Sequence, residues 1–271
     1  MSFGFTFGVE LPPDNASYGL FNPVPSSQLR DFNPDRPDKT NGSHTLDAGH
    51  FQLEMDMLSY TRDRDAGVST NDYTLANANL RIGLTSFADL QLQIPCYQIN
   101  NTHASATGQT SHDQGIGDLT VALKLNAWGN DGTGSAGGVE FSIKTPTGAR
   151  AVSNGRTEGS ATFLWDSDLP DGFGLGINSG VAVDFNDSGS GYHADLVESV
   201  SVSHDIIGPL SAYVEFYSLF NPKQTGDWIG SVDVGFVYGI GKNMEVDAGV
   251  NLGVTNTAPD QQAFVGFSIR Y

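Results

Sequence analysis

From Gly49 to the C-terminus, apolar and polar residues alternate along the chain, and this alternation limits its fold more than any other feature. In residues 244–254, Met, Val, Ala, Val, Leu and Val alternate with Glu, Asp, Gly, Asn and Gly. Successive side chains of a β-strand point to opposite faces, so this segment has one apolar face and one polar face. Similar runs predict about twelve strands, at residues 49–61, 72–85, 87–99, 115–128, 136–146, 158–167, 172–185, 190–204, 209–220, 227–239, 242–254 and 262–271.

The apolar residues are never gathered into one long run. No segment approaches the ~18 consecutive apolar residues that a membrane-spanning helix needs, which excludes a helical membrane protein. A mean hydropathy of -0.23 is still compatible with a barrel in lipid, because alternating strands average to a mildly polar composition. The weakest run is residues 190–204, where Glu198 falls on the nominally apolar face.

Connections between the predicted strands alternate in length. Those at 85–87, 169–172, 206–209 and 240–242 are tight, and those at 62–71, 100–114, 147–157 and 255–261 are longer and more polar. Outer-membrane barrels show this asymmetry, and an even strand number brings both termini to the periplasmic side. The sequence therefore predicts an all-β protein, a closed antiparallel transmembrane β-barrel of about twelve strands with an N-terminal extended arm.

A soluble β-sandwich or jelly roll is the alternative, because its strands alternate too. Three features favour the barrel. The polar faces are rich in small residues, as in Gly174, Gly176 and Gly249; aromatic residues gather near strand ends; and the chain stops on an aromatic strand residue, Tyr271.

The first 45 residues contain six prolines and little sustained alternation, which makes them a poor region for central strands. We interpret residues 1–45 as an extended arm and residues 46–271 as the barrel. We expect Asp35, Arg36 and Asp38 to plug or line the periplasmic mouth, with Arg36 meeting inward carboxylates. The alternative is a periplasmic arm of no consequence for transport. Residues 1–7 lack the basic start and apolar core of a signal peptide, so if the chain is a barrel we expect this to be a mature or re-engineered form; otherwise the missing signal argues against export.

Several motifs resemble one protein family. Residues 32–40 (FNPDRPDKT) precede residues 48–54 (AGHFQLE), and residues 80–85 (LRIGLT), 115–120 (GIGDLT) and 144–148 (KTPTG) follow in order. This set is similar to the MetA-pathway of phenol degradation family, whose members are often called transporters. The resemblance covers residues from about 30 to the C-terminus and implies an outer-membrane barrel. The final Val265, Phe267, Ile269 and Tyr271 also resemble the signal read by the outer-membrane assembly machinery.

The ionisable residues of the polar faces are the candidate functional set. Alternation assigns to the lumen Glu54, Asp56, Arg81, Asp89, Lys124, Glu140, Lys144, Asp184, Asp195, Glu215, Asp233, Glu245, Asp247 and Arg270. Lumen charges can tune solute selectivity, whereas charges on the lipid face cost a few kcal/mol near the midplane. The alternative is that these charges pair across a filled interior and hold it together.

Other chemistry has little support. A net charge of -18 argues against nucleic-acid binding, and the single Cys96 excludes an intrachain disulfide. The six histidines lack zinc-type spacing, and we predict no metal, cofactor or catalytic residue. The acidic loops at 63–65 and 184–189 could bind calcium, but neither matches an EF-hand, and turn residues are the favoured explanation. An outer-membrane lipid hydrolase is a distant alternative. It would need a Ser–His pair on adjacent strands, and the sequence neighbours Ser203 and His204 point to opposite faces.

The sequence thus predicts a non-enzymatic protein of the bacterial outer membrane, in contact with lipid and the assembly machinery. Its expected function is passive passage of small, aromatic or hydrophobic solutes of unknown identity. A closed structural or interaction barrel is the alternative.

Overall fold

The computed structural model describes residues 17–132, 134–186, 189–223 and 228–271, and within them nearly all regular structure is β. The strands are β1 Phe51–Asp65, β2 Val68–Thr85, β3 Ala88–Ala104, β4 Gln109–Gly115, β5 Leu119–Trp128, β6 Ser135–Thr145, β7 Glu158–Asp168, β8 Phe173–Phe185, β9 Tyr192–Ile207, β10 Leu210–Phe220, β11 Ile229–Gly239, β12 Met244–Gly253 and β13 Gln261–Arg270. A short 3-10 turn, η2 Pro170–Gly172, joins β7 to β8. No helix among the described residues is long and apolar enough to cross a membrane.

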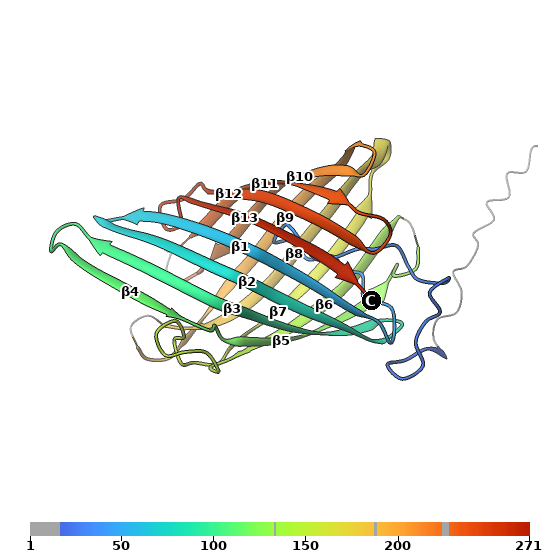
Figure 1. Ribbon diagram of the computed structural model, residues 1–271, viewed down its shortest axis with the longest axis horizontal. Coiled ribbons are helices and arrows are strands. Elements are labelled where there is room, and N and C mark those ends of the chain that lie inside the picture. The colour runs from blue at the N-terminus through green and yellow to red at the C-terminus, as the bar shows by residue number, and fades with distance from the viewer. Residues whose placement is uncertain (1–16, 133, 187–188, 224–227) are drawn as a thin grey trace, which may run out of the picture.

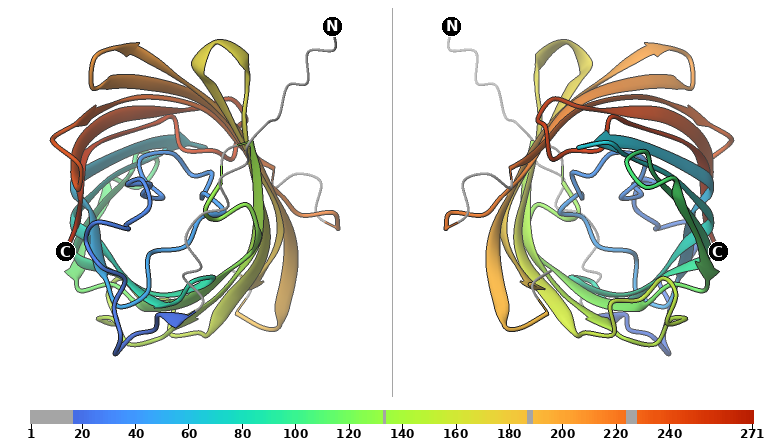
Figure 2. Two further views of the ribbon diagram at one scale, coloured as in Figure 1. Left: turned by 90° about the vertical axis from the view of Figure 1, so that its right-hand side faces the viewer. Right: turned by 90° about the vertical axis from the view of Figure 1, so that its left-hand side faces the viewer.

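Antiparallel pairing closes the strands into a barrel (Figures 1 and 2). Apart from β4 and β5, consecutive strands pair with each other, and β13 pairs with β1 to close the barrel. Strands β4 and β5 share one position beside β3, because β3 pairs with β4 over residues 98–104 and with β5 over 88–93. Twelve positions therefore surround the lumen, and the predicted fold class is confirmed.

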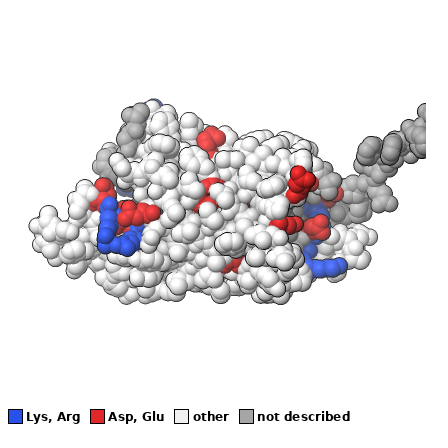
Figure 3. All heavy atoms as spheres, turned by 90° about the horizontal axis from the view of Figure 1, so that it is seen from above, with Lys and Arg blue, Asp and Glu red and all other residues white. Residues whose placement is uncertain are grey.

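The two faces of the wall are the reverse of those of a soluble β protein. Large apolar side chains lie on the outside, where Phe141 is 49% and Ile143 55% exposed. The intervening residue Ser142 and its neighbours Glu140 and Lys144 face the interior, and Glu140 is buried. In Figure 3, Lys and Arg gather toward the two ends of the molecule, and the middle of that face is mostly uncharged. Such an apolar outer band is what lipid requires and water penalises.

Two of the predicted long loops are wrong. Residues 62–65 and 68–71 continue β1 and β2 to a tight turn at Ala66 and Gly67, and residues 100–104 and 109–114 form the β3–β4 hairpin. The predicted strand 115–128 is interrupted at residues 116–118, where the Gly117 amide bonds the Pro95 carbonyl and the Ile116 carbonyl accepts from Ala149. Figure 1 shows these hairpins projecting beyond the rest of the barrel.

The short connections after β2, β5, β7, β9 and β11 lie at one end of the barrel, which we call the turn end. The described arm, residues 17–50, leads into β1 at this end, and Tyr271 bonds the backbone of Phe51 there. The opposite end, where β6, β8, β10 and β12 finish, is the loop end.

Candidate functional site: the lumen and its arm

Part of the arm lies inside the barrel. Residues 30–47, which we call the lumen segment, cross the interior in Figure 2 and contact strands on all sides. Asp35 reaches Lys124 on β5, Arg36 reaches Asp247 on β12, and Thr40 reaches Ser199 on β9. The segment has little apolar character, and its path is therefore determined by polar contacts with the wall.

Asp35 is the centre of the largest charge cluster. Its Oδ1 is 2.5 Å from the Lys124 Nζ and accepts the Gly42 amide at 3.1 Å, and its Oδ2 is 3.2 Å from the Arg81 Nη1. Burial alone would raise the pKa of Asp35, but the positive charges of Arg81 and Lys124 outweigh it and lower that pKa. Asp35 is therefore a carboxylate held by two fully buried cations.

Arg81 links Asp35 to the wall. Its Nη1 is 3.1 Å from the Glu54 Oε1, and its Nη2 is 2.7 Å from the Asp89 Oδ2. Glu54 in turn accepts the Asp35 backbone amide at 3.2 Å. Strands β1, β2 and β3 each supply one charged residue, and because every charge has an opposite partner the cluster can be buried.

Arg36 makes the second cluster. Its guanidinium nitrogens lie 2.6 Å from the Asp56 Oδ1 and 2.5 Å from the Asp247 Oδ1, and its Cζ is 5.7 Å from the centre of the Phe264 ring. A Cβ added to Gly266 would lie 2.2 Å from the Arg36 Nη2. Glycine at 266 therefore makes room for the guanidinium against the wall.

Lys39 and Thr40 bind the opposite wall. The Lys39 Nζ is 2.9 Å from the Asp233 Oδ2, and its amide donates to the Glu215 Oε2 at 3.0 Å. The Thr40 hydroxyl donates to the Glu215 Oε1 at 2.5 Å. The preceding Asp38 has no such cation: burial, and then the charge of Glu215, raise its pKa well above the usual range.

The segment then returns to the turn end. Leu46 donates its amide to the Asp89 Oδ2 at 2.9 Å, and Asp47 lies 3.5 Å from Arg30 and 3.6 Å from Arg270. A Cβ on Gly83 would lie 1.9 Å from the Asp47 carbonyl oxygen, so β2 needs glycine where the returning backbone passes.

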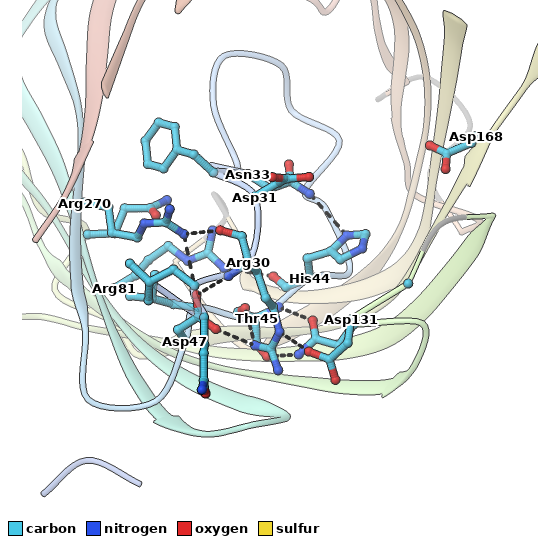
Figure 4. Close-up of a pocket in the computed structure, with 17 residues that line it drawn as sticks. Arg30, Asp31, Asn33, His44, Thr45, Asp47, Arg81, Asp131, Asp168 and Arg270 are labelled. Atoms are coloured by element: carbon cyan, nitrogen blue, oxygen red, sulfur yellow. Dashed lines mark hydrogen bonds and ion pairs between the residues drawn. The ribbon is translucent and has the colours of Figure 1, made fainter. Parts of the chain in front are cut away.

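Two cavities flank the lumen segment at the turn end. The β1-side cavity has a volume of about 540 Å³ and is lined by Arg30, Asp47, Arg81 and Arg270 among others (Figure 4). The β10-side cavity has a volume of about 360 Å³ and is lined by Arg36, Asp38, Tyr213 and Glu245 among others. Phe32, Asn33, His44 and Asp168 border both, so the arm separates them.

The structure places all fourteen predicted lumen residues on the inward side of the wall. Ten of them contact the lumen segment: Glu54, Asp56, Arg81, Asp89, Lys124, Glu140, Glu215, Asp233, Asp247 and Arg270. Glu245 borders the β10-side cavity, and Lys144 pairs with Asp118 and Glu158. Asp184 and Asp195 lie together near the loop end. Their roles in selectivity stay predictions.

The predicted site residues were all ionisable, so they did not include the neutral polar residues of the wall or several contacting residues of the arm. Gln91 donates to Glu140, Asn126 donates to the Ser43 carbonyl, and the Asn178 side chain donates to the Asn41 backbone carbonyl. Alternation already put these side chains on the polar face. The family-like stretch 32–40 includes Lys39 and Thr40, but no contact was predicted for them or for Asp47, because the arm has no periodicity from which to read a facing residue.

The last strand, His204 and the acidic loop 184–189 were also singled out in the sequence. Val265, Phe267 and Ile269 alternate with the inward Gly266, Ser268 and Arg270, and their reading by an assembly machinery stays a prediction. His204 lies opposite Phe173 and Ala212 on the adjacent strands, so neither direct cross-strand neighbour is a serine. The acidic loop 184–189 includes Asp187, which falls outside the described residues.

Comparison with known proteins agrees with this architecture. The model of the family described as "Putative MetA-pathway of phenol degradation" matches residues 34–271. No curated protein sequence matches the chain. The COG4313 outer membrane channel from Pseudomonas putida F1 aligns with a TM-score of 0.53 and 13% identity, over 82% of this chain and 93% of that chain. The NanC porin aligns at 0.49 and 11%, over 79% and 98%. The transport unit of the Escherichia coli autotransporter AIDA-I aligns at 0.49 and 12%, over 82% and 89%.

Proposed function

This chain belongs to the MetA-pathway of phenol degradation family, and from this premise we propose that it is a passive channel of the bacterial outer membrane. Its lumen admits small solutes, and the lumen segment of the arm sets the free cross-section. Lipid contacts the apolar outer band, and the outer-membrane assembly machinery reads the last strand.

The observation that carries this proposal is the kind of contact that holds the arm. Ion pairs and hydrogen bonds attach residues 30–47 to the wall, and cavities of about 540 and 360 Å³ remain beside them. Polar contacts can be exchanged for contacts with water at modest net cost, unlike a packed apolar core. Residues 30–47 can therefore be displaced from the lumen, and the cavities beside them form part of the route for solutes.

Charge gives the lumen a preference among ions. The fourteen wall residues comprise ten carboxylates and four cations, and residues 30–47 add four Asp residues against two Arg and one Lys. An excess of negative charge in a low-dielectric channel favours cations and uncharged solutes over anions.

Small aromatic solutes are the finer proposal. The family's description refers to phenol degradation, and Phe32 borders both cavities among hydrogen-bonding side chains. A site with an apolar ring and several polar groups suits a small solute that carries both.

Solute flux into liposomes tests the proposal. Proteoliposomes containing the full chain should admit phenol and small neutral solutes faster than protein-free liposomes do, and benzoate more slowly than phenol. Flux equal to the protein-free rate for every solute would contradict it.

The contacts of the arm also support the alternative of a closed structural barrel, because ten of the fourteen lumen charges already have a partner in it. That alternative predicts that replacing lumen charges changes thermal stability and leaves permeability at the protein-free level. A hydrolytic activity is the remaining alternative, and the absence of catalysis stays a prediction, to be checked with a phospholipid substrate.

A further inference from the structure

Strands β8 and β9 bring three metal-ligating side chains together near the loop end of the lumen. Asp184 and His193 are direct cross-strand partners, and Asp195 follows two residues after His193 on the same face. One potential ligand atom from each lies within 4.8 Å of the others. Ser199 and Asn178, at even spacing along the same strands, contact the arm, so this face is the lumen face.

The hydrogen bonds around His193 determine which ring nitrogen carries a proton. The Asn186 Nδ2 donates to the Ser190 carbonyl at 2.7 Å, which turns the Asn186 Oδ1 toward the His193 Nδ1 at 2.8 Å. An amide oxygen only accepts, so Nδ1 is the protonated nitrogen. His193 Nε2 therefore faces the carboxylates and has a lone pair to offer unless the ring is cationic. A partner that fixes the tautomer in this way is typical of metal-binding histidines.

Asp195 supplies an independent observation. Its side chain is 9% exposed, and its Oδ2 lies 3.3 Å from the His193 Nε2. Its Oδ1 is buried with no hydrogen-bond partner among the described residues. Leaving a buried carboxylate oxygen without a donor costs free energy, and a cation at this point would remove that cost.

The Lys144 ammonium group is not the cation that satisfies Asp195. Lys144 pairs with Glu158, whose other oxygen accepts the Phe185 amide at 3.0 Å. Lys144 also lies 3.8 Å from Asp118. With Lys144 engaged by two other carboxylates, Asp184, His193 and Asp195 keep a formal charge of -2 when His193 is neutral.

We propose that Asp184, His193 and Asp195 bind a divalent first-row transition cation of the Zn²⁺ type. One imidazole and two carboxylates form a three-ligand set of the kind that binds Zn²⁺ with water in the remaining position. The imidazole disfavours Ca²⁺ and Mg²⁺, which prefer oxygen ligands. A bound cation ties the end of β8 to the start of β9 and reduces the negative charge of the lumen near the loop end. This site does not depend on whether the barrel conducts solutes.

Zinc binding to the folded full chain tests the site. The protein is purified in detergent without a polyhistidine tag, stripped with a chelator, and titrated calorimetrically with ZnCl₂. Co²⁺ absorption reports the nitrogen ligand. The variants are Asp195→Asn, His193→Gln and Asn186→Ala, and the matched control is His112→Gln, which removes an exposed histidine from β4. Heat-modifiable migration in gels confirms that each variant is a folded barrel.

We expect one zinc per chain, a loss of at least tenfold in affinity for Asp195→Asn and His193→Gln, and a 10- to 100-fold loss for Asn186→Ala. The control should bind as the wild type does. No zinc uptake above the detergent blank would overturn the proposal and leave an imidazolium–carboxylate pair. Equal losses in the control and the site variants, or Ca²⁺ binding in preference to Zn²⁺, would also overturn it.

Discussion

Replacement of Asp35 by Asn should release the arm from the lumen. The substitution keeps the size of the side chain and removes a negative charge that pairs with both Lys124 and Arg81. Both cations are buried almost completely, so each loses a partner that water does not replace. The substitution should weaken docking of the arm and leave the barrel wall intact, because residue 35 takes no part in the pairing of the strands.

Removing one partner from a buried charge network typically costs about 3–5 kcal/mol, since the remaining charge stays buried. At about 1.4 kcal/mol per tenfold change, the ratio of released to docked arm should rise by roughly two to three and a half orders of magnitude. Arg81 keeps Glu54 and Asp89 as partners, which favours the lower end of this range.

Limited trypsin digestion after Lys39 measures this ratio, because in the docked arm Lys39 lies inside the barrel and pairs with Asp233. Arg36 precedes Pro37 and is therefore not a trypsin site. When opening is fast relative to cleavage, the cutting rate follows the population of released arm. The matched control is Asp65→Asn, at the exposed end of β1. If trypsin cut after Lys39 in Asp35→Asn at a rate within twofold of the wild-type rate, Asp35 would not hold the arm in the lumen.

Three further perturbations have definite expected outcomes. Gly266→Ala should displace the Arg36 guanidinium and speed trypsin cleavage after Lys39 at least tenfold, whereas Gly239→Ala, where a Cβ has ordinary contacts, should not. Equal cleavage rates in the two variants would contradict the close approach of Arg36 to Gly266. Burial and Glu215 raise the pKa of Asp38, so the docked arm binds more protons than the released arm, and docking weakens as pH rises through that raised pKa. Asp38→Asn should therefore slow cleavage severalfold at pH 7 and remove this pH dependence, and an unchanged pH profile would argue against it. Glu198 is exposed on the lipid face and accepts a hydrogen bond from Ser179 there. Glu198→Val should therefore raise the free energy of unfolding by about 1 kcal/mol, measured by urea unfolding from vesicles. A lower free energy of unfolding would contradict an outward Glu198.

The alternation of residues predicted the wall well, because a barrel in lipid must keep apolar residues outside over the whole membrane thickness. Residues 244–253 show this most clearly. The strand extensions at 62–65 and 68–71 were missed, because their residues are mostly polar and show no alternation, although their backbones pair in register. Glu198 was correctly assigned to the outward face although its charge weakened the strand prediction.

The contacts of the arm could not be predicted from the sequence, because they join residues far apart in the chain. Lys39 contacts Asp233 and Arg36 contacts Asp247, which are about two hundred residues away in the chain. Local patterns carry no information about which inward carboxylate an extended segment will meet. The sequence predicted that Arg36 would meet inward carboxylates, but it did not indicate which ones, and it did not predict the pairing of Lys39 with Asp233.

Single-channel conductance of the full chain and of a variant lacking residues 1–45, both in planar bilayers, tests whether the barrel conducts and whether its arm limits the conductance. We expect a small, cation-selective conductance for the full chain and a severalfold larger one for the truncated barrel, with the selectivity retained. Equal conductance with equal thermal stability, or no conductance from either protein once folding is verified, would contradict it.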